Sequence, residues 1–140
     1  MTLILASQSP RRRELLSLVA ETFTCQTSRA DESLPAGTPP DRAVEMLSLR
    51  KALAVWDQLP DPEDHVVIGS DTVVAVDGRI LGKPRDQADC LGMLQTLSGR
   101  EHVVHTGVAL AWGERTRVFR ETARVTFWPL TREEMAWYAG

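Results

Sequence analysis

The stretch that decides the fold spans residues 66–84 and reads VVIGSDTVVAVDGRILGKP. Residues 66–69 and 72–76 are rich in β-branched side chains, so they predict two strands. Residues 77 and 78 are Asp-Gly, the dipeptide favoured in the type I′ turns of two-residue hairpins. We therefore expect two short strands followed by a tight turn.

A carboxylate and an ammonium stand at the ends of these expected strands. Asp71 lies between the two apolar runs, where an acid is poor strand chemistry unless it has a function; the alternative is a side chain that only forms a turn or a bulge. Lys83 follows Gly82, but a nucleotide P-loop is excluded, because only three residues separate Gly78 from Gly82 and Pro84 replaces the Ser or Thr of that motif. We interpret 66–84 as a metal-and-phosphate site in which Lys83 meets phosphate as a point charge.

Hydrophobic periodicity and turn signals extend the prediction to the rest of the chain. Before the central stretch they predict, in order, a strand at 2–6, a helix at 10–20, a strand at 23–27, a loop at 28–40 and a helix at 41–59. After it they predict a helix at 86–97, strands at 102–112 and 115–128 joined through Gly113-Glu114, and a helix from about 132. Strand, loop and helix in alternation indicate an α/β layer fold.

Finer expectations concern caps and faces. Ser9 before Pro10, Asp41, and Thr131 with Glu134 are helix-start signals. The first helix should pack one apolar face, made by Leu15, Leu16, Val19 and Ala20, on the sheet. The last hairpin should have one wet face, because Phe119, Ala123, Val125 and Phe127 alternate with Arg120, Thr122, Arg124 and Thr126.

Composition bounds the class of protein. The chain has 140 residues, 43% of them apolar and 25% charged, with a formal net charge of −3, which is typical of one soluble globular domain and gives no electrostatic push toward nucleic acid or anionic membrane. Cys25 and Cys90 are expected to be reduced core thiols. No apolar run approaches the roughly 20 residues of a membrane span, and the start has its apolar part before its basic part, the reverse of a secretory signal. We expect a cytoplasmic protein.

Three arginines, at positions 11–13, crowd the first turn of the first helix. Cations there have the wrong sign for the helix dipole, so an anion should offset them. A phosphate would be held by free backbone N–H groups, by the hydroxyls of Ser7 and Ser9, and by arginine forks. The alternative is a solvated basic turn that Ser9 merely caps.

Other charged candidates give weaker signals. Lys51 falls on the apolar line of its helix, so it either extends past the core to water or points into a pocket. Asp31-Glu32 could ligate Mg²⁺ or Mn²⁺, although acids in loops are usually just solvated. His102 and His105 lie on opposite faces of one strand by parity, which argues against a shared metal site.

Several short motifs, taken in order, resemble the Maf family of nucleoside triphosphate pyrophosphatases, which are also labelled septum-formation inhibitors. They are Ala-Ser-Gln-Ser-Pro-Arg-Arg at 6–12, Asp31-Glu32, Lys51-Ala52, Gly69-Ser70-Asp71-Thr72-Val73-Val74, Gly82-Lys83-Pro84, Leu97-Ser98-Gly99 and residues 102–107. The resemblance covers essentially the whole chain. It implies an α/β fold with a mixed, elongated sheet flanked by helices, similar to inosine triphosphate pyrophosphatases, and house-cleaning cleavage of a nucleoside triphosphate to the monophosphate and pyrophosphate.

The resemblance also implies roles for individual residues. Asp71 would be the catalytic acid that activates water, directly or through a divalent metal (Mg²⁺ or Mn²⁺) to which Glu32 also contributes. The triphosphate would be gripped by Ser7, Ser9, Arg12, Lys51 and Lys83. Arg11 after Pro10 and Thr72 after Asp71 resemble the branch that prefers dTTP and UTP, so pyrimidine or modified pyrimidine triphosphates are the expected substrates.

One departure from the family pattern affects function. Family members usually continue for some fifty residues, including a G-E-P-x-D-K-A-G-x-Y-x-x-Q-G segment, whereas this sequence ends at Gly140. We therefore expect a single domain, 1–140, that lacks the usual C-terminal part, and two alternatives stay open: a nucleotide-binding or septum-regulating module without turnover, and direct DNA binding through Arg11 to Arg13, which the acidic net charge disfavours. Dimers occur in the family, but the sequence leaves the oligomeric state open. Residues 66–84 thus supply Asp71, Thr72 and Lys83, and their partners come from elsewhere in the chain.

Overall fold

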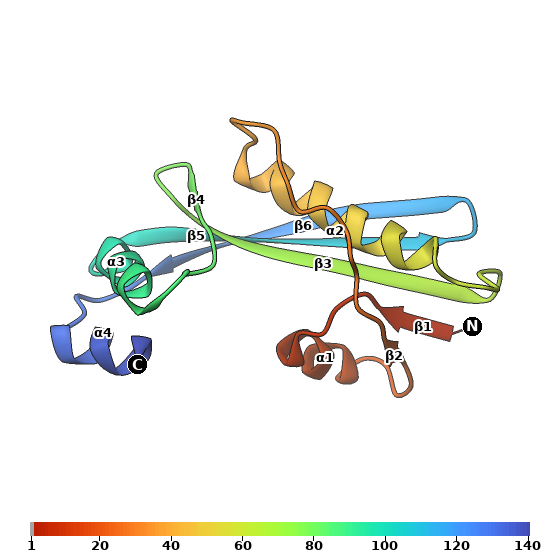
Figure 1. The fold of residues 1–140 in the computed structure, drawn as a ribbon, viewed down its shortest axis with the longest axis horizontal. Helices are drawn as coiled ribbons and strands as arrows, with labels where there is room; N and C mark the ends of the chain where they lie inside the picture. The colour runs from red at the N-terminus through yellow and green to blue at the C-terminus, as the bar shows by residue number, and fades with distance from the viewer. Residues whose placement is uncertain (1) are drawn as a thin grey trace.

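A computed structural model describes residues 2–140 and shows a mixed sheet with helices on both faces (Figure 1). The order along the sheet is β2-β1-β3-β5-β6, and β4 pairs with β3 off this path. The strands are β1 (Thr2–Leu5), β2 (Thr24–Cys25), β3 (His65–Val76), β4 (Arg79–Leu81), β5 (Glu101–Trp112) and β6 (Arg115–Thr126). The helices are α1 (Pro10–Ser17), α2 (Pro40–Trp56), α3 (Gln87–Leu97) and α4 (Arg132–Ala139). The predicted mixed α/β class is confirmed.

The long strand β3 corrects the prediction of two short strands. It runs without a break through Asp71, which pairs with Gly107 of the antiparallel β5. An acid is accommodated in the middle of this strand because the ladder to β5 satisfies its backbone, while its side chain reaches a partner on α2. The turn that follows is confirmed as type I′, since Asp77 and Gly78 both have positive φ angles, 52° and 77°.

The parallel strands β2, β1 and β3 explain why the first two helices cover opposite faces. The crossover from β1 to β2 moves one way along the sheet, and the crossover from β2 to β3 moves back past β1. Because both crossovers are expected to be right-handed, this reversal sends α1 to one face and α2 to the other, as Figure 1 shows. Reversals of this kind leave a crevice at the carboxyl ends of the neighbouring strands, where ligands of α/β proteins usually bind.

Helix α2 lies on the sheet with almost no space between the two backbones. Gly69 of β3 and Gly107 of β5 permit this approach, because a Cβ at either position would overlap a carbonyl oxygen of α2, that of Ser48 or Val44 respectively. The core lies between this helix and strands β1, β3 and β5. Its buried cluster consists of Ile4, Ala6, Ala52, Val55, Val67, Ala109 and Ala111.

Helix α1 departs from its expected packing. Ser9 is confirmed as its N-cap, but the helix ends at Ser17 instead of near Ala20, and Leu15 and Val19 are 48% and 85% exposed. The expected apolar face on the sheet is therefore wrong. The two-residue strand β2 offers too short a surface for the second turn of α1 to cover.

Helices α3 and α4 pack on each other near the carboxyl end of β3. The predicted capping box of α4 is confirmed, with both of its hydrogen bonds present. The expected cap of α2 is wrong, because Pro39 occupies that position and Asp41 lies inside the first turn. Strand β6 does not bury one apolar face: Phe119 is 46% exposed and Ala123 is exposed, since β6 is an edge strand without a helix on that face at this point.

Two further observations concern cysteines and membranes. Cys25 and Cys90 are free, as expected, but Cys25 is exposed and so is not a core thiol. Among residues 2–140, no helix combines the length and the apolar character needed to cross a membrane.

Candidate active site

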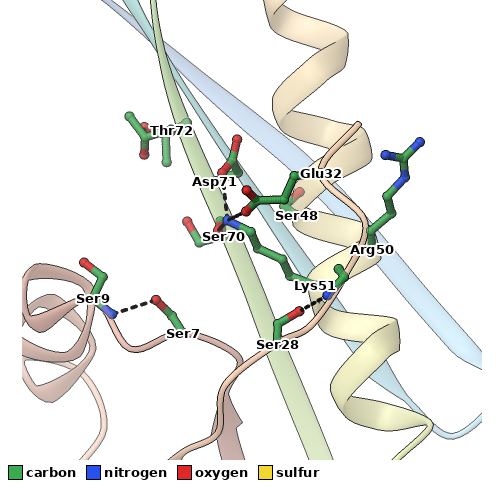
Figure 2. A network of polar contacts seen from close by, with 12 residues as sticks. Ser7, Ser9, Ser28, Glu32, Ser48, Arg50, Lys51, Ser70, Asp71 and Thr72 are labelled. Atoms are coloured by element: carbon green, nitrogen blue, oxygen red, sulfur yellow. Dashed lines mark hydrogen bonds and ion pairs between the residues drawn. The ribbon is translucent and has the colours of Figure 1, made fainter. Parts of the chain in front are cut away.

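An ion-pair cluster joins α2, β3 and the loop between β2 and α2 (Figure 2). The Lys51 Nζ lies 2.8 Å from the Asp71 Oδ1 and 3.6 Å from the Glu32 Oε1. It also donates to the carbonyl oxygen of Ser70 at 3.4 Å. The side chains of Lys51 and Asp71 are only 14% and 13% exposed, so this pair is screened by solvent far less than a surface salt bridge. Lys51 therefore points toward the strand, and the alternative that it extends past the core to water is ruled out.

The loop places Glu32, not Asp31, at this cluster. The carboxylate of Asp31 accepts hydrogen bonds from the backbone N–H and the hydroxyl of Ser33, and these hydrogen bonds lower its pKa below the usual value. Arg50 donates to the backbone carbonyls of Asp31 and Ser33, on either side of Glu32. Asp31 is thus occupied within its own turn, and Glu32 is presented to Lys51.

Arg50 is a residue that sequence reasoning missed. It precedes Lys51 on α2 and holds the loop, although no motif marks it. The only available signal was its position beside Lys51, and a helical arginine is usually read as a solvated side chain.

The first turn of α1 forms a second polar group at the carboxyl end of β1. The Ser9 backbone N–H donates to the Ser7 Oγ at 3.0 Å, and the Arg12 N–H lies 3.4 Å from the Ser9 Oγ. Ser7 is buried, whereas the exposed Arg11 pairs with Glu14 at 3.8 Å. The wrong-sign cations of this turn are therefore offset in part within the helix itself. The backbone N–H of Ala6 donates to the carbonyl of Ile68, so this turn begins beside β3, close to Asp71 along the strand.

Three predicted site residues lie apart from the Lys51 cluster. Thr72 follows Asp71 but points to the opposite face of β3 (Figure 2). Lys83 is exposed in the connection between β4 and α3, and within residues 2–140 neither it nor Arg11 forms an ion pair with Asp71 or Glu32. The structure thus brings Lys51, Asp71 and Glu32 together, places Ser7, Ser9 and Arg12 in the turn and helix that follow β1, and leaves Arg11, Thr72 and Lys83 outside the cluster.

The donor set around Lys51 limits which metal chemistry fits. In the described part of the chain no group of three or more His, Cys, Asp or Glu side chains is arranged to hold a metal ion. Asp71 and Glu32 offer two carboxylates, which is the protein contribution that Mg²⁺ commonly receives when substrate phosphates and water supply the other ligands. These two carboxylates therefore suit a metal that receives most of its other ligands from a bound anion and water, not a metal held in an all-protein cage.

An apolar cavity of about 680 Å³ lies elsewhere, between α3 and α4. Its lining includes Met93, Leu94, Leu97, Met135 and Trp137, and none of the clustered polar residues. Its walls offer few polar groups for a charged ligand, so we place the candidate active site at the Lys51 cluster.

Comparisons with known sequences identify relatives along the whole described chain. The family model described as Maf-like protein matches residues 2–140. A dTTP/UTP pyrophosphatase of Bacillus cereus (strain ATCC 10987 / NRS 248) is 46% identical over 136 residues, covering 97% of this chain and 66% of that protein. The dTTP/UTP pyrophosphatase of Bacillus cytotoxicus is 48% identical over 135 residues, covering 96% of this chain and 69% of that protein. The chain thus spans about two thirds of the length of these curated relatives.

Comparisons with solved structures support the fold. The structure of the Staphylococcus aureus Ham1 protein superposes with a TM-score of 0.60 at 15% identity, covering 89% of this chain and 70% of that one. The protein VC0702 from Vibrio cholerae superposes with a TM-score of 0.51 at 12% identity, covering 90% and 63% of the two chains. At these identities the likeness establishes a shared architecture only.

Proposed function

Since the chain belongs to the Maf family, we propose that it hydrolyses dTTP and UTP, or modified pyrimidine nucleoside triphosphates, to the monophosphate and pyrophosphate. The structural observation that carries the proposal is the ion pair between Lys51 and Asp71, with Glu32 beside it, on β3 just past the carboxyl end of the parallel strand β1. Topological reversals like the one between the two crossovers of β1, β2 and β3 are where α/β proteins usually bind phosphorylated ligands.

The proposed reaction is attack of water between the α- and β-phosphates. Asp71 would orient the water and accept its proton, since it is the most enclosed carboxylate of the cluster. Lys51 would hold Asp71 in place and counter the charge that develops on the phosphates. The N–H groups and hydroxyls at the start of α1, together with Arg12 and Lys83, would bind the leaving pyrophosphate.

A divalent cation is part of the proposal. Asp71 and Glu32 would hold Mg²⁺ or Mn²⁺ together with the substrate phosphates. When bound, the metal would neutralise phosphate charge and make the phosphorus more electrophilic toward water. Removal of divalent cations with a chelator is therefore expected to abolish turnover and to weaken triphosphate binding.

The experiment that tests the proposal is incubation of the chain with dTTP or UTP and Mg²⁺, followed by measurement of monophosphate and pyrophosphate. We expect product from the native chain and at least a hundredfold loss in Asp71→Asn, since a carboxamide cannot accept the proton and removal of a catalytic base typically costs 10² to 10⁴ in rate. Asp77→Asn is the matched control, because Asp77 is an exposed acid at the type I′ turn where Asn is also favoured. Absence of product from the native chain would contradict the proposal.

A second candidate is a nucleotide-binding, septum-regulating module without turnover. The close ion pair with Lys51 favours it, because the Lys51 ammonium at 2.8 Å already occupies the Asp71 Oδ1, which would otherwise accept a hydrogen bond from water. Calorimetry separates the candidates: under this one dTTP binds, no monophosphate forms, and Asp71→Asn changes neither result.

Two further parts of the proposal concern the cell and the assembly. We propose a cytoplasmic location. We also propose no stable binding of nucleic acid, since the net charge of −3 gives no electrostatic attraction to it. The chain could form a homodimer. Light scattering of the purified chain would report the state of association.

A further inference from the structure

The sheet has a second face near the candidate site that the proposed reaction does not use. Helix α2 covers one face, and α1 lies on the other face near one end while α3 and α4 lie near the opposite end (Figure 1). Because side chains alternate along a strand, Asp71 is directed to α2 and Thr72 is directed to the less covered face. Thr72 is exposed there.

A row of polar side chains crosses three strands on this face. Thr72 of β3 pairs with Thr106 of β5, which pairs in turn with Glu121 of β6. The Oγ1 atoms of Thr72 and Thr106 lie 3.4 Å apart. The flanking rows are mostly apolar and consist of Val74, Val104 and Ala123 on one side and Ser70, Val108 and Phe119 on the other.

The hydroxyls of Thr72 and Thr106 together can both donate and accept hydrogen bonds to a ligand. When one threonine donates to the other, the pair keeps one free O–H donor and free acceptor lone pairs side by side. A pyrimidine base carries adjacent donor and acceptor atoms along its polar edge, and its ring faces are apolar. The hydroxyl pair matches that edge, and the valines and Phe119 beside it match the ring.

The position of the pair fits the rest of a nucleotide. Ser70, Asp71 and Thr72 are consecutive, and Thr72 is two residues, or about 7 Å, along the strand from Ser70. The turn of Ser7 begins beside this part of β3, since Ala6 donates to the carbonyl of Ile68. Phosphates at the start of α1 would therefore leave the base within reach of the hydroxyl pair.

We propose that Thr106 is a base-binding residue that acts together with Thr72 on the polar edge of a pyrimidine base; this inference rests on the proposed function. Thr106 lies on β5, outside all the segments that we propose to bind the phosphates. A purely structural role is the competing explanation, because facing threonines on neighbouring strands also stabilise sheets.

The test compares two ligands that share the phosphates and differ in the base. Calorimetry in the presence of Mg²⁺ measures binding of α,β-methylene dTTP, which resists cleavage, and of inorganic tripolyphosphate. The variants are Thr106→Val and Thr72→Val, which replace a hydroxyl by a methyl group of similar size. Thr122→Val is the matched control, since Thr122 lies on the α2 side of β6 and contacts His105 instead.

We expect Thr106→Val to weaken binding of the nucleotide analogue about three- to tenfold, the effect of one lost hydrogen bond, and to leave tripolyphosphate binding unchanged. Thr72→Val should give a similar loss, and the double variant should lose less than the product of the two, because either substitution already breaks the pair. Thr122→Val should change neither affinity.

Three outcomes would overturn the inference. Equal loss for both ligands would assign Thr106 a structural role, and unchanged affinity for the analogue would place the base elsewhere. A native chain that binds tripolyphosphate but not the analogue would leave the anion site standing without a base site. Failure of the native chain to bind either ligand would remove the proposed function itself, and circular dichroism of each variant keeps misfolding apart from these results.

Discussion

Lys51 is the residue on which the candidate site depends, because its ammonium compensates Asp71 in a place that water barely reaches. Lys51→Met would keep the length and the apolar stem of the side chain but leave the Asp71 charge without its partner. Breaking a fully buried pair costs about 3–5 kcal/mol, and since these side chains keep some exposure we expect a loss of about 1–3 kcal/mol in the free energy of unfolding. Urea denaturation at neutral pH measures it.

Arg42→Met on the same helix is the control for Lys51→Met. Arg42 pairs with Glu45 at 3.3 Å on the exposed surface, where one ion pair contributes about 0–1 kcal/mol. If the two substitutions destabilise the chain equally, then the enclosed position of the Lys51 pair has no energetic consequence and our description of the cluster is wrong.

At this scale the sequence predicts part of the site. Lys51 and Asp71 stand out because each breaks an apolar pattern, and both lie in the cluster. The choice of Glu32 over Asp31 was less accessible, since it depends on Ser33 occupying Asp31 and on Arg50 holding the loop. Contacts between a loop and a distant helix leave no local pattern to read.

Among the elements, α2 and β3 position the site through a backbone contact that tolerates no side chain. In Gly69→Ala the new Cβ would overlap the Ser48 carbonyl oxygen and lie 2.8 Å from the Ala52 nitrogen, so α2 must move away from the sheet. We expect a loss of about 3 kcal/mol in the free energy of unfolding, at the upper end of ordinary overpacking because the clash is with backbone. Thermal or urea unfolding measures the change.

Gly92→Ala is the matched control for Gly69→Ala. Gly92 lies inside α3, and an added Cβ there meets no atom of the described chain within 4 Å apart from its chain neighbours and the nearby backbone of its own helix. Alanine is favoured over glycine in a helix by about 1 kcal/mol, so this variant should be as stable as the native chain or more so. A Gly69→Ala chain of native stability would show that α2 has room to adapt.

Local chemistry accounts for the elements that sequence predicts well. Ser9, Thr131 and the Asp77-Gly78 turn satisfy or shape the backbone within a few residues, and all three have the predicted role. The predicted break at Asp71 failed because the backbone of β3 is stabilised by β5, a strand some thirty-five residues further along the chain. The predicted cap at Asp41 failed because the two prolines before it already set the extended-to-helical transition.

The buried core of the molecule lies where α2 packs on β1, β3 and β5. The other end of the sheet carries α3 and α4, which have no buried residue. The sequence indicates an α/β class, but the strand order and the opposite faces of α1 and α2 follow from pairings between distant segments. The apolar stripe on α1 suggested a buried face, yet neither α1 nor α3 has a fully buried residue. A stripe records that a helix has an apolar side, but not how completely another surface covers it.

This uneven burial predicts that the chain opens in two steps. Helices α3 and α4 contain no buried residue and pack mainly on each other, whereas α2 contributes six buried residues to the contact with the sheet. We expect native-state hydrogen exchange in low urea to show amides of α3 and α4 exchanging through a partial opening, while those of α2, β3 and β5 exchange only on global unfolding.

Paired substitutions make this last expectation specific. Val55→Ala removes methyl groups from the core and should lower the exchange free energies of all amides that require global unfolding, by about 2 kcal/mol. Leu94→Ala, in the cavity between α3 and α4, should lower those of α3 and α4 and change those of α2 little. If Leu94→Ala instead lowers the exchange free energies of all amides equally, the two ends of the sheet unfold as one unit. The partial exposure of α3 and α4 would then cause no local instability.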